Sequence, residues 1–182
     1  MSTDSVTLLL AVLAVMAAMW TVAIGVGASS ARRNPTAAER WRVARDTHGT
    51  TALLAAGLVA LVMMGGSLYL SEVADFPPCR LCWYQRIAAY PLGPILGLAW
   101  FRRDRAVRPY ALLLAGAGTV ISLYHVLLER FPSLETGACE IDNPCTVRWV
   151  ERLGFMTIPT MALIGFVTIA TILLFCPRED HT

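Results

Sequence analysis

The sequence PPCRLCWYQR at residues 77–86 decides the fold, because it places a Cys-x-x-Cys pair where one apolar run ends and the next begins. This spacing serves zinc, iron–sulfur clusters, haem attachment, structural disulfides and redox chemistry. Haem attachment needs a His after the second cysteine, where Trp83 stands. A closed zinc site is disfavoured because the other pair, Cys139 and Cys145, lies far along the chain without a nearby His. Redox use is therefore favoured.

The composition indicates an integral membrane protein. Of the 182 residues, 56% are hydrophobic and 15% are charged, which is more apolar than a soluble core of this size needs. Five apolar runs each approach the ~20 residues that cross a hydrocarbon core as a helix: 6–28, 51–70, 83–101, 110–128 and 158–175. We therefore predict an all-α protein with five membrane spans.

The basic residues predict the orientation of these spans. All fifteen are Arg, so the positive-inside count rests on Arg alone. Ten lie between the first and second runs, between the third and fourth, or in the tail: Arg32, Arg33, Arg40, Arg42, Arg45, Arg102, Arg103, Arg105, Arg108 and Arg178. This bias predicts an outer N-terminus, an inner C-terminus and both cysteine pairs outside, where disulfides persist.

The first 50 residues are expected to form an N-terminal span and an inner linker. A cleaved signal peptide is the alternative, but the stretch before the first run holds Asp4 and no positive charge. The linker 32–45 predicts a short interfacial helix with Thr36 as N-cap, Glu39 as its capping-box partner, and Trp41 and Val43 facing the membrane surface. Nearby, the residue at position 48, a His, is expected to be structural or solvated. Residues 51–176 are expected to form the core, and 177–182 an inner tail.

The first cysteine pair is expected at the N-terminus of a helix that begins near Leu81 or Cys82. The helix dipole and free N–H groups there stabilise a thiolate, which would make Cys82 the better electron donor. Arg86 lies one turn further on the same face, where its guanidinium could bond a quinone carbonyl. The alternative is an Arg that reaches to the lipid headgroups. Gln85 could bind the same ligand or be an interfacial polar residue.

The segment from Cys79 to Leu92, CRLCWYQRIAAYPL, resembles the signature of the DsbB family of thiol:quinone oxidoreductases. The short second cysteine loop is more similar to the BdbC branch of that family. The resemblance continues through HVLLERFPS at 125–133, the pair Cys139 and Cys145, and TIPTMALIGF at 157–166, and covers roughly residues 52–175. It implies a four-helix transmembrane bundle, to which the run 6–28 adds a helix without a counterpart.

The resemblance also implies roles for the site residues. Cys139 and Cys145 would take electrons from a DsbA-like thiol oxidase of thioredoxin fold, and Cys145 would then react with Cys79. The electrons would leave through Cys82 to ubiquinone or menaquinone. Arg86, Gln85 and His125 would lie at the quinone, although His125 could also be a plain interfacial residue. A monomer in the bacterial cell membrane is implied, without metal or nucleic acid.

Two further expectations concern the second cysteine loop. Its short spacing should limit how far Cys145 can travel toward Cys79, so the loop would have to move as a whole or be carried by partner binding. After it, Val147, Val150 and Leu153 recur at helical spacing, which predicts a short amphipathic helix on the outer surface, with a plain connector as the alternative. The fifth cysteine, Cys176, is expected to be a reduced bystander.

Two other functions remain open on the sequence. A vitamin K epoxide reductase-like enzyme also places a Cys-x-x-Cys pair beside a quinone site in a helical bundle, but its active pair follows the loop pair, and the order here is reversed. A membrane protein whose disulfides only brace its loops would have unreactive disulfides and no quinone. That reading gives Arg86 and the thiols at the helix start no purpose.

Overall fold

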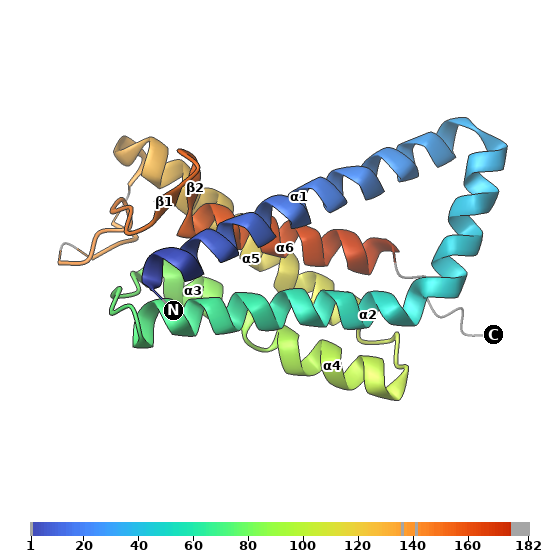
Figure 1. Ribbon diagram of the computed structural model, residues 1–182, viewed down its shortest axis with the longest axis horizontal. Coiled ribbons are helices and arrows are strands. Elements are labelled where there is room, and N and C mark those ends of the chain that lie inside the picture. Colours follow the sequence, from blue (N-terminus) through green and yellow to red (C-terminus); the bar gives the residue numbers. More distant parts are fainter. Residues whose placement is uncertain (1, 136, 141, 176–182) are drawn as a thin grey trace.

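A computed structural model describes residues 2–135, 137–140 and 142–175, with the side chains of 46 and 48–50 left aside. Its elements run in the order α1 (Thr3–Arg33), α2 (Pro35–Glu72), α3 (Arg80–Ala89), α4 (Leu92–Arg102), α5 (Arg108–Arg130), the 3₁₀ turn η1 (Pro132–Leu134), β1 (Glu151–Arg152), β2 (Met156–Thr157) and α6 (Ile158–Phe175). Figure 1 shows the long helices side by side, with α3, β1, β2 and the start of α1 at one end of the bundle.

Four helices in the described part of the chain are long and apolar enough to cross a membrane: Thr3–Arg33, Thr51–Glu72, Arg108–Arg130 and Ile158–Phe175. The predicted span at 83–101 is instead divided into α3 and α4, of 10 and 11 residues. Pro91 stands at the break, where it supplies no backbone N–H to continue α3. At about 1.5 Å per residue, neither helix alone crosses a bilayer.

The linker between the first two spans differs from its prediction. Asn34, not Thr36, caps the helix, and its side chain accepts the Thr36 N–H at 3.0 Å. Glu39 pairs with Arg42 at 2.8 Å and takes no part in a capping box. The helix then continues into the second span as α2, although Figure 1 shows its cyan first part turned steeply away from the rest.

Trp41, predicted to face the membrane surface, is half-buried and also contacts the last span, whereas Val43 is exposed. The Trp41 ring meets Phe175 edge-on, with centroids 5.1 Å apart, and so closes the end of the bundle. At the same end, Arg45 Nε donates to the Phe175 carbonyl at 2.9 Å, and Arg108 Nε donates to the Leu173 carbonyl at 2.6 Å. These arginines satisfy carbonyl groups that the last turn of α6 leaves without a helical partner.

Small residues let the core helices approach closely. Ala52, Ala56 and Ala60 of α2 are buried against Leu92 and Leu96 of α4 in the main core. In lipid, where apolar surface gains little from leaving the solvent, such close packing holds helices together. This packing fixes α4 on the flank of α2, as Figure 1 shows.

The amphipathic helix predicted after Cys145 does not form. The segment carries instead a two-stranded antiparallel hairpin, in which Glu151 faces Thr157 and Arg152 faces Met156. Val150 is 5% exposed, whereas Val147 and Leu153 are 43% and 54% exposed, so the three share no buried face. The prediction of an all-α protein is thus correct except for this hairpin of four residues in two strands.

Candidate redox site

Cys79 is the N-cap of α3. Its backbone is extended, and its Sγ accepts the backbone N–H of Cys82 at 3.3 Å. Two prolines, Pro77 and Pro78, precede it, and because a proline disfavours helical backbone in the residue before it, the helix does not extend back through them. The helix thus begins within two residues of the predicted start, with both thiols in its first turn.

The two sulfurs of this pair are 2.8 Å apart, and both are free thiols. The hydrogen bonds that favour a thiolate meet at Cys79, not at Cys82 as predicted. Cys79 Sγ accepts the Cys82 backbone N–H and has His125 Nε2 3.7 Å away, so we assign the thiol hydrogen between the two sulfurs to Cys82. Against the cost of burial, these contacts lower the pKa of Cys79 to about 4. The reduced pair is therefore arranged to hold its negative charge on Cys79.

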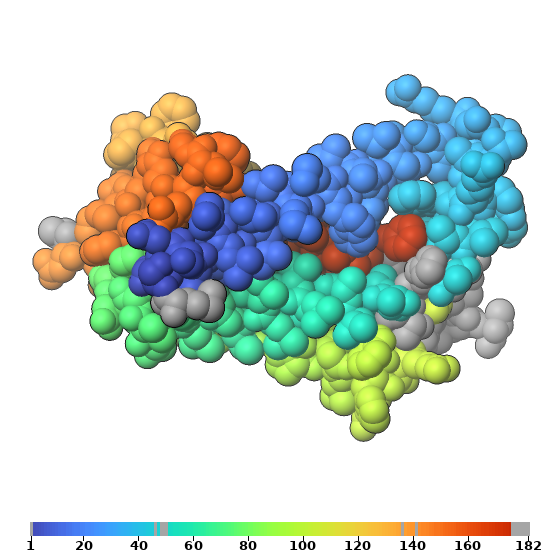
Figure 2. All heavy atoms as spheres, in the orientation of Figure 1, coloured from blue at the N-terminus to red at the C-terminus, as the bar shows by residue number. Residues whose placement is uncertain are grey.

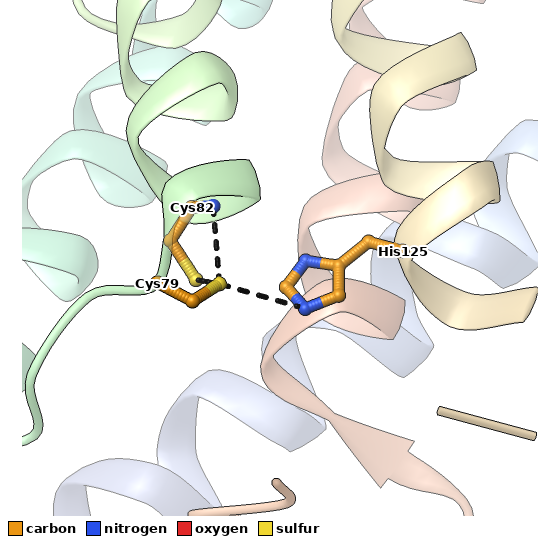
Figure 3. A group of neighbouring side chains, drawn as sticks. All are labelled: Cys79, Cys82 and His125. Carbon is orange, nitrogen blue, oxygen red and sulfur yellow. Dashed lines mark hydrogen bonds between the residues drawn. The ribbon is translucent and has the colours of Figure 1, made fainter. Parts of the chain in front are cut away.

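His125 of α5 connects the two cysteine pairs. Figure 3 shows its ring directed at the two sulfurs of the first pair. The same Nε2 lies 3.1 Å from the Cys145 carbonyl, and Nδ1 lies 3.3 Å from Gln85 Nε2. Because a carbonyl only accepts, Nε2 carries the proton, and Nδ1 accepts from the Gln85 amide. His125 and Gln85 are both buried among protein groups, and their roles at a quinone stay predictions.

The second pair, Cys139 and Cys145, forms a disulfide with Cα atoms 5.8 Å apart. Both residues are buried in one cluster with Cys79 and Leu128. The loop between them is tied down, because Asn143 Nδ2 donates to the Pro78 carbonyl at 3.1 Å. The loop therefore holds the second pair in the same cluster as the first, and its movement as a whole, or with the bound partner, stays a prediction.

A cavity of about 320 Å³ opens beside the first pair, at the lower end of the range for small-molecule sites. Cys82, Gln85 and Arg86 give it one polar side, and the rest of its wall is mainly apolar. Arg86 is 8% exposed, and its guanidinium is bonded within the protein to Ser67. This combination of a flat-ring-sized apolar space and one cationic side fits a quinone headgroup.

Ser67 of α2 holds Arg86 in place. Its Oγ accepts from Arg86 Nε at 2.9 Å, and its carbonyl accepts from Arg86 Nη2 at 3.0 Å. The Trp83 ring lies 5.0 Å from the guanidinium carbon. These contacts pair two of the guanidinium nitrogens and hold the buried cation in one position. A guanidinium that binds a ligand needs such a fixed position.

Cys79, Cys82 and His125 also bring three possible metal ligands within 4.8 Å of one another. A soft divalent cation would take all three only if His125 Nε2 gave up its proton and its bond to the Cys145 carbonyl. The expectation of a metal-free site stays a prediction.

Comparison with known proteins identifies the family. The family model described as disulfide bond formation protein DsbB matches residues 49–176. The chain belongs to the DsbB family. It is 46% identical over 118 residues to disulfide bond formation protein C of Bacillus subtilis strain 168, a match covering 64% of this chain and 86% of that protein. No solved structure matches the chain.

Other relatives place the chain within that family. The probable disulfide formation protein C of Bacillus cereus is 41% identical over 127 residues, which are 69% of this chain and 91% of the relative. That of Halalkalibacterium halodurans is 41% identical over 128 residues, which are 70% and 93%. The DsbB family and its BdbC-like branch, expected from the motifs, are thus confirmed, as is an oxidoreductase of disulfide bond formation in a multi-pass membrane protein.

Sequence reasoning missed three polar residues: Ser67, which borders the cavity, and Glu129 and Thr157, which bond each other near the C-terminal end of α5. Glu129 is buried on α5, where Thr157 Oγ1 donates to its carboxylate at 2.6 Å and Arg148 Nη2 donates to its carbonyl at 2.8 Å. Each lies within or beside an apolar run, which is a signal for function in a membrane helix. Cys176 and the side chain at position 48 lie outside the described residues.

Proposed function

We propose that this DsbB-family protein is a thiol:quinone oxidoreductase that reoxidises an extracytoplasmic thiol oxidase of thioredoxin fold. One observation carries the proposal. Cys79 is linked through His125 to Cys145, whereas Cys82 lines the cavity with Arg86. The two cysteines of one pair thus face the two ends of an electron path.

The first half of the reaction takes place at the disulfide between Cys139 and Cys145. A partner thiolate attacks Cys139, which forms a mixed disulfide and releases Cys145 as a thiolate. The partner's second thiol then closes its own disulfide and frees Cys139. Two electrons have moved from the partner to this pair, and the partner is oxidised.

The second half moves the same two electrons to the first pair in its oxidised state. The Cys145 thiolate attacks Cys79, Cys82 leaves, and Cys139 then resolves the Cys145–Cys79 disulfide. The donor to this step lies beside Cys79 because His125 binds the Cys145 carbonyl. The reduced first pair holds one thiolate, at Cys79, hydrogen-bonded to the Cys82 thiol.

A bound quinone would accept two electrons from the pair, one proton from the Cys82 thiol and a second proton from water, and so return the first pair to a disulfide. Cys82 and Arg86 would lie against it, and Gln85 would offer it an amide donor. Arg86 would favour the negative charge that develops on the ring oxygen. Ubiquinone and menaquinone both fit this chemistry.

We further propose five spans in the bacterial cell membrane, with α3 and α4 together forming the third, and a monomeric working unit. The start of α3, which Cys79 caps, lies at the same end of the bundle as the first turn of α1 in Figure 1, and the second cysteine pair is in one cluster with Cys79. The Arg-rich linker between α1 and α2 lies at the other end of the bundle, which supports an outer N-terminus and outer cysteines.

The test is quinone reduction by the purified protein with a reduced thioredoxin-fold oxidase as donor, using ubiquinone and menaquinone analogues in turn. We expect turnover by the parent and by the control Cys176→Ser, and none by Cys82→Ser or Cys139→Ser. Turnover at the parental rate in either of the last two would refute the relay. Failure with every quinone and donor would favour disulfides that only brace the loops.

A further inference from the structure

Helix α1 lies wholly before the residues matched by the family model, which begin at residue 49. We propose that α1 is a wall of the quinone site and contacts the bound ring or the first units of its isoprenoid tail. This inference rests on the proposed function, and assigns to α1 a ligand-binding role that the core alone does not supply.

One face of α1 lines the cavity. Leu10, Leu13, Ala14 and Ala17 recur at the spacing of a single helical face, and all four border the same space as Cys82 and Arg86. The two alanines are small, so they leave room that a larger side chain would take. The wall that α1 presents is entirely apolar, which suits a ring edge or a prenyl chain and not a charged ligand.

The position of α1 is fixed by polar contacts at two depths. In its first turns, Arg152 of β1 donates to Thr7 Oγ1 at 3.0 Å and forms an ion pair with Asp4. Deeper in the bundle, the hydroxyls of Thr21 and Thr168 are 3.0 Å apart. Thr7 is buried, so the bond to Arg152 is part of a packed interface and is not exposed to lipid.

Apolar contacts also hold α1 in this position. Ala11 and Ala14 are buried against Met156 of the hairpin, with Met161 and Ile164 of α6 beside them. Figure 2 shows the dark-blue start of α1 lying against the orange segment after the second cysteine pair and against green α2. The same part of α1 therefore packs against the hairpin that follows the second cysteine pair and lines the cavity.

The cavity is also lined from α2 and α6, which α1 packs against together. Val62 and Met63 of α2 and Ala162 and Gly165 of α6 border it. Because α1 lies along this seam, the cavity meets protein there and not lipid. On this side, α1 and not the four-helix core would enclose the quinone.

A matched pair of variants tests this placement. Ala17 and Ala18 are adjacent, both are half-buried, and only Ala17 borders the cavity. We expect Ala17→Phe to raise the KM for quinone about tenfold by filling the space, while Ala18→Phe stays within about twofold of the parent. Reduction of the cysteine pairs by the donor in a single turnover without quinone should be unchanged in both. Equal KM values for the two variants would overturn the inference.

Photolabelling of the unaltered protein with an azidoquinone keeps the proposal testable if Ala17→Phe fails to fold. We expect label in peptides from residues 3–33, competed by excess unmodified quinone. Competed label only in peptides from residues 51–175, with normal turnover, would overturn the inference and leave the proposed function standing. Absence of both competed label and turnover would refute the proposed function itself.

Discussion

At the scale of single residues, the site is organised by which atom holds a proton. His125 Nε2 is protonated because it faces the Cys145 carbonyl, and the same N–H is directed toward Cys79. The Cys82 thiol gives its hydrogen to the same sulfur. Cys79 is therefore the thiolate of the reduced pair, and its partner is the thiol.

This arrangement predicts the pH dependence of alkylation in the reduced protein. An ordinary thiol reacts less as pH falls below about 8.5, since its thiolate fraction falls. With a pKa lowered to about 4, Cys79 should keep nearly its full labelling rate by iodoacetamide down to about pH 6. His125→Ala should raise that pKa in part, since the Cys82 hydrogen bond remains, so the labelling rate should begin to fall at a higher pH than in the parent.

Mass spectrometry can read the two cysteines separately, because trypsin cleaves after Arg80 between them. Cys82 serves as the internal control and should label more slowly than Cys79 at every pH below its own titration. A Cys79 rate that falls tenfold for each unit of pH between about 8 and 6 would contradict the assignment of the thiolate.

Ser67 supplies a second prediction at this scale. In Ser67→Ala, Arg86 Nε loses its acceptor, and the guanidinium gains freedom at the cavity. A hydrogen bond to a charged group is worth about 1.5–3 kcal/mol, and the Ser67 carbonyl retains part of it. We expect the quinone KM to rise by roughly three- to tenfold in steady-state assays. Ser71→Ala, one turn away and bonded to its own helix, is the control; an equal effect there would contradict the role of Ser67.

At the scale of elements, close contact between α5 and α6 depends on a glycine. A Cβ at Gly118 would overlap the Phe166 ring, which is fully buried, whereas a Cβ at Gly116 would meet nothing within 4 Å. The two positions are on the same helix and differ only in what they face. They form a natural test of helix packing.

We expect Gly118→Ala to destabilise the detergent-solubilised protein by about 1–3 kcal/mol through overpacking. Gly116→Ala should be neutral or slightly stabilising, since Ala is the better helix former. Thermal unfolding followed by circular dichroism measures both. A Gly118→Ala variant as stable as Gly116→Ala would show that α5 and α6 do not pack in this way.

The sequence predicts those elements whose formation depends on nearby residues, and it fails for those that depend on tertiary contacts. The apolar runs that became α1, α5 and α6 depend only on local composition, and the start of α3 depends on local proline and cysteine chemistry. The helix predicted after Cys145 failed because three apolar residues at helical spacing say nothing about which face a tertiary contact will bury. Here only Val150 is buried, and Leu153 adopts a left-handed backbone that turns the hairpin.

The site residues also divide into those with a local sequence signal and those that only the fold brings together. The four cysteines and Arg86 were found from spacing and from charge in an apolar setting. Ser67 was not, because its partner is 19 positions away, and only the fold brings the two together. The thiolate was assigned to Cys82 for a related reason. The helix N-terminus favours both thiols, and the choice between them depends on His125, which lies 46 positions from Cys79.

At the scale of the whole molecule, the Arg distribution predicts which end is outside. Single cysteines can be placed at Asp4 and Arg40 of a chain whose five native cysteines are replaced by Ser. In intact cells, a membrane-impermeant maleimide should label Asp4→Cys and not Arg40→Cys. Both should react after detergent treatment. Labelling of Arg40→Cys alone in intact cells would invert the proposed topology.

Helix α6 is fastened at both ends. Arg45 and Arg108 bind its final carbonyls, and at its other end Thr157, the residue just before the helix, donates to Glu129. Because both ends of α6 are bonded to neighbouring elements, we predict that this helix keeps its position through the proposed cycle. The rate would then be set by how fast the partner oxidase binds and leaves, and raising the concentration of that oxidase would speed the cycle until departure became limiting.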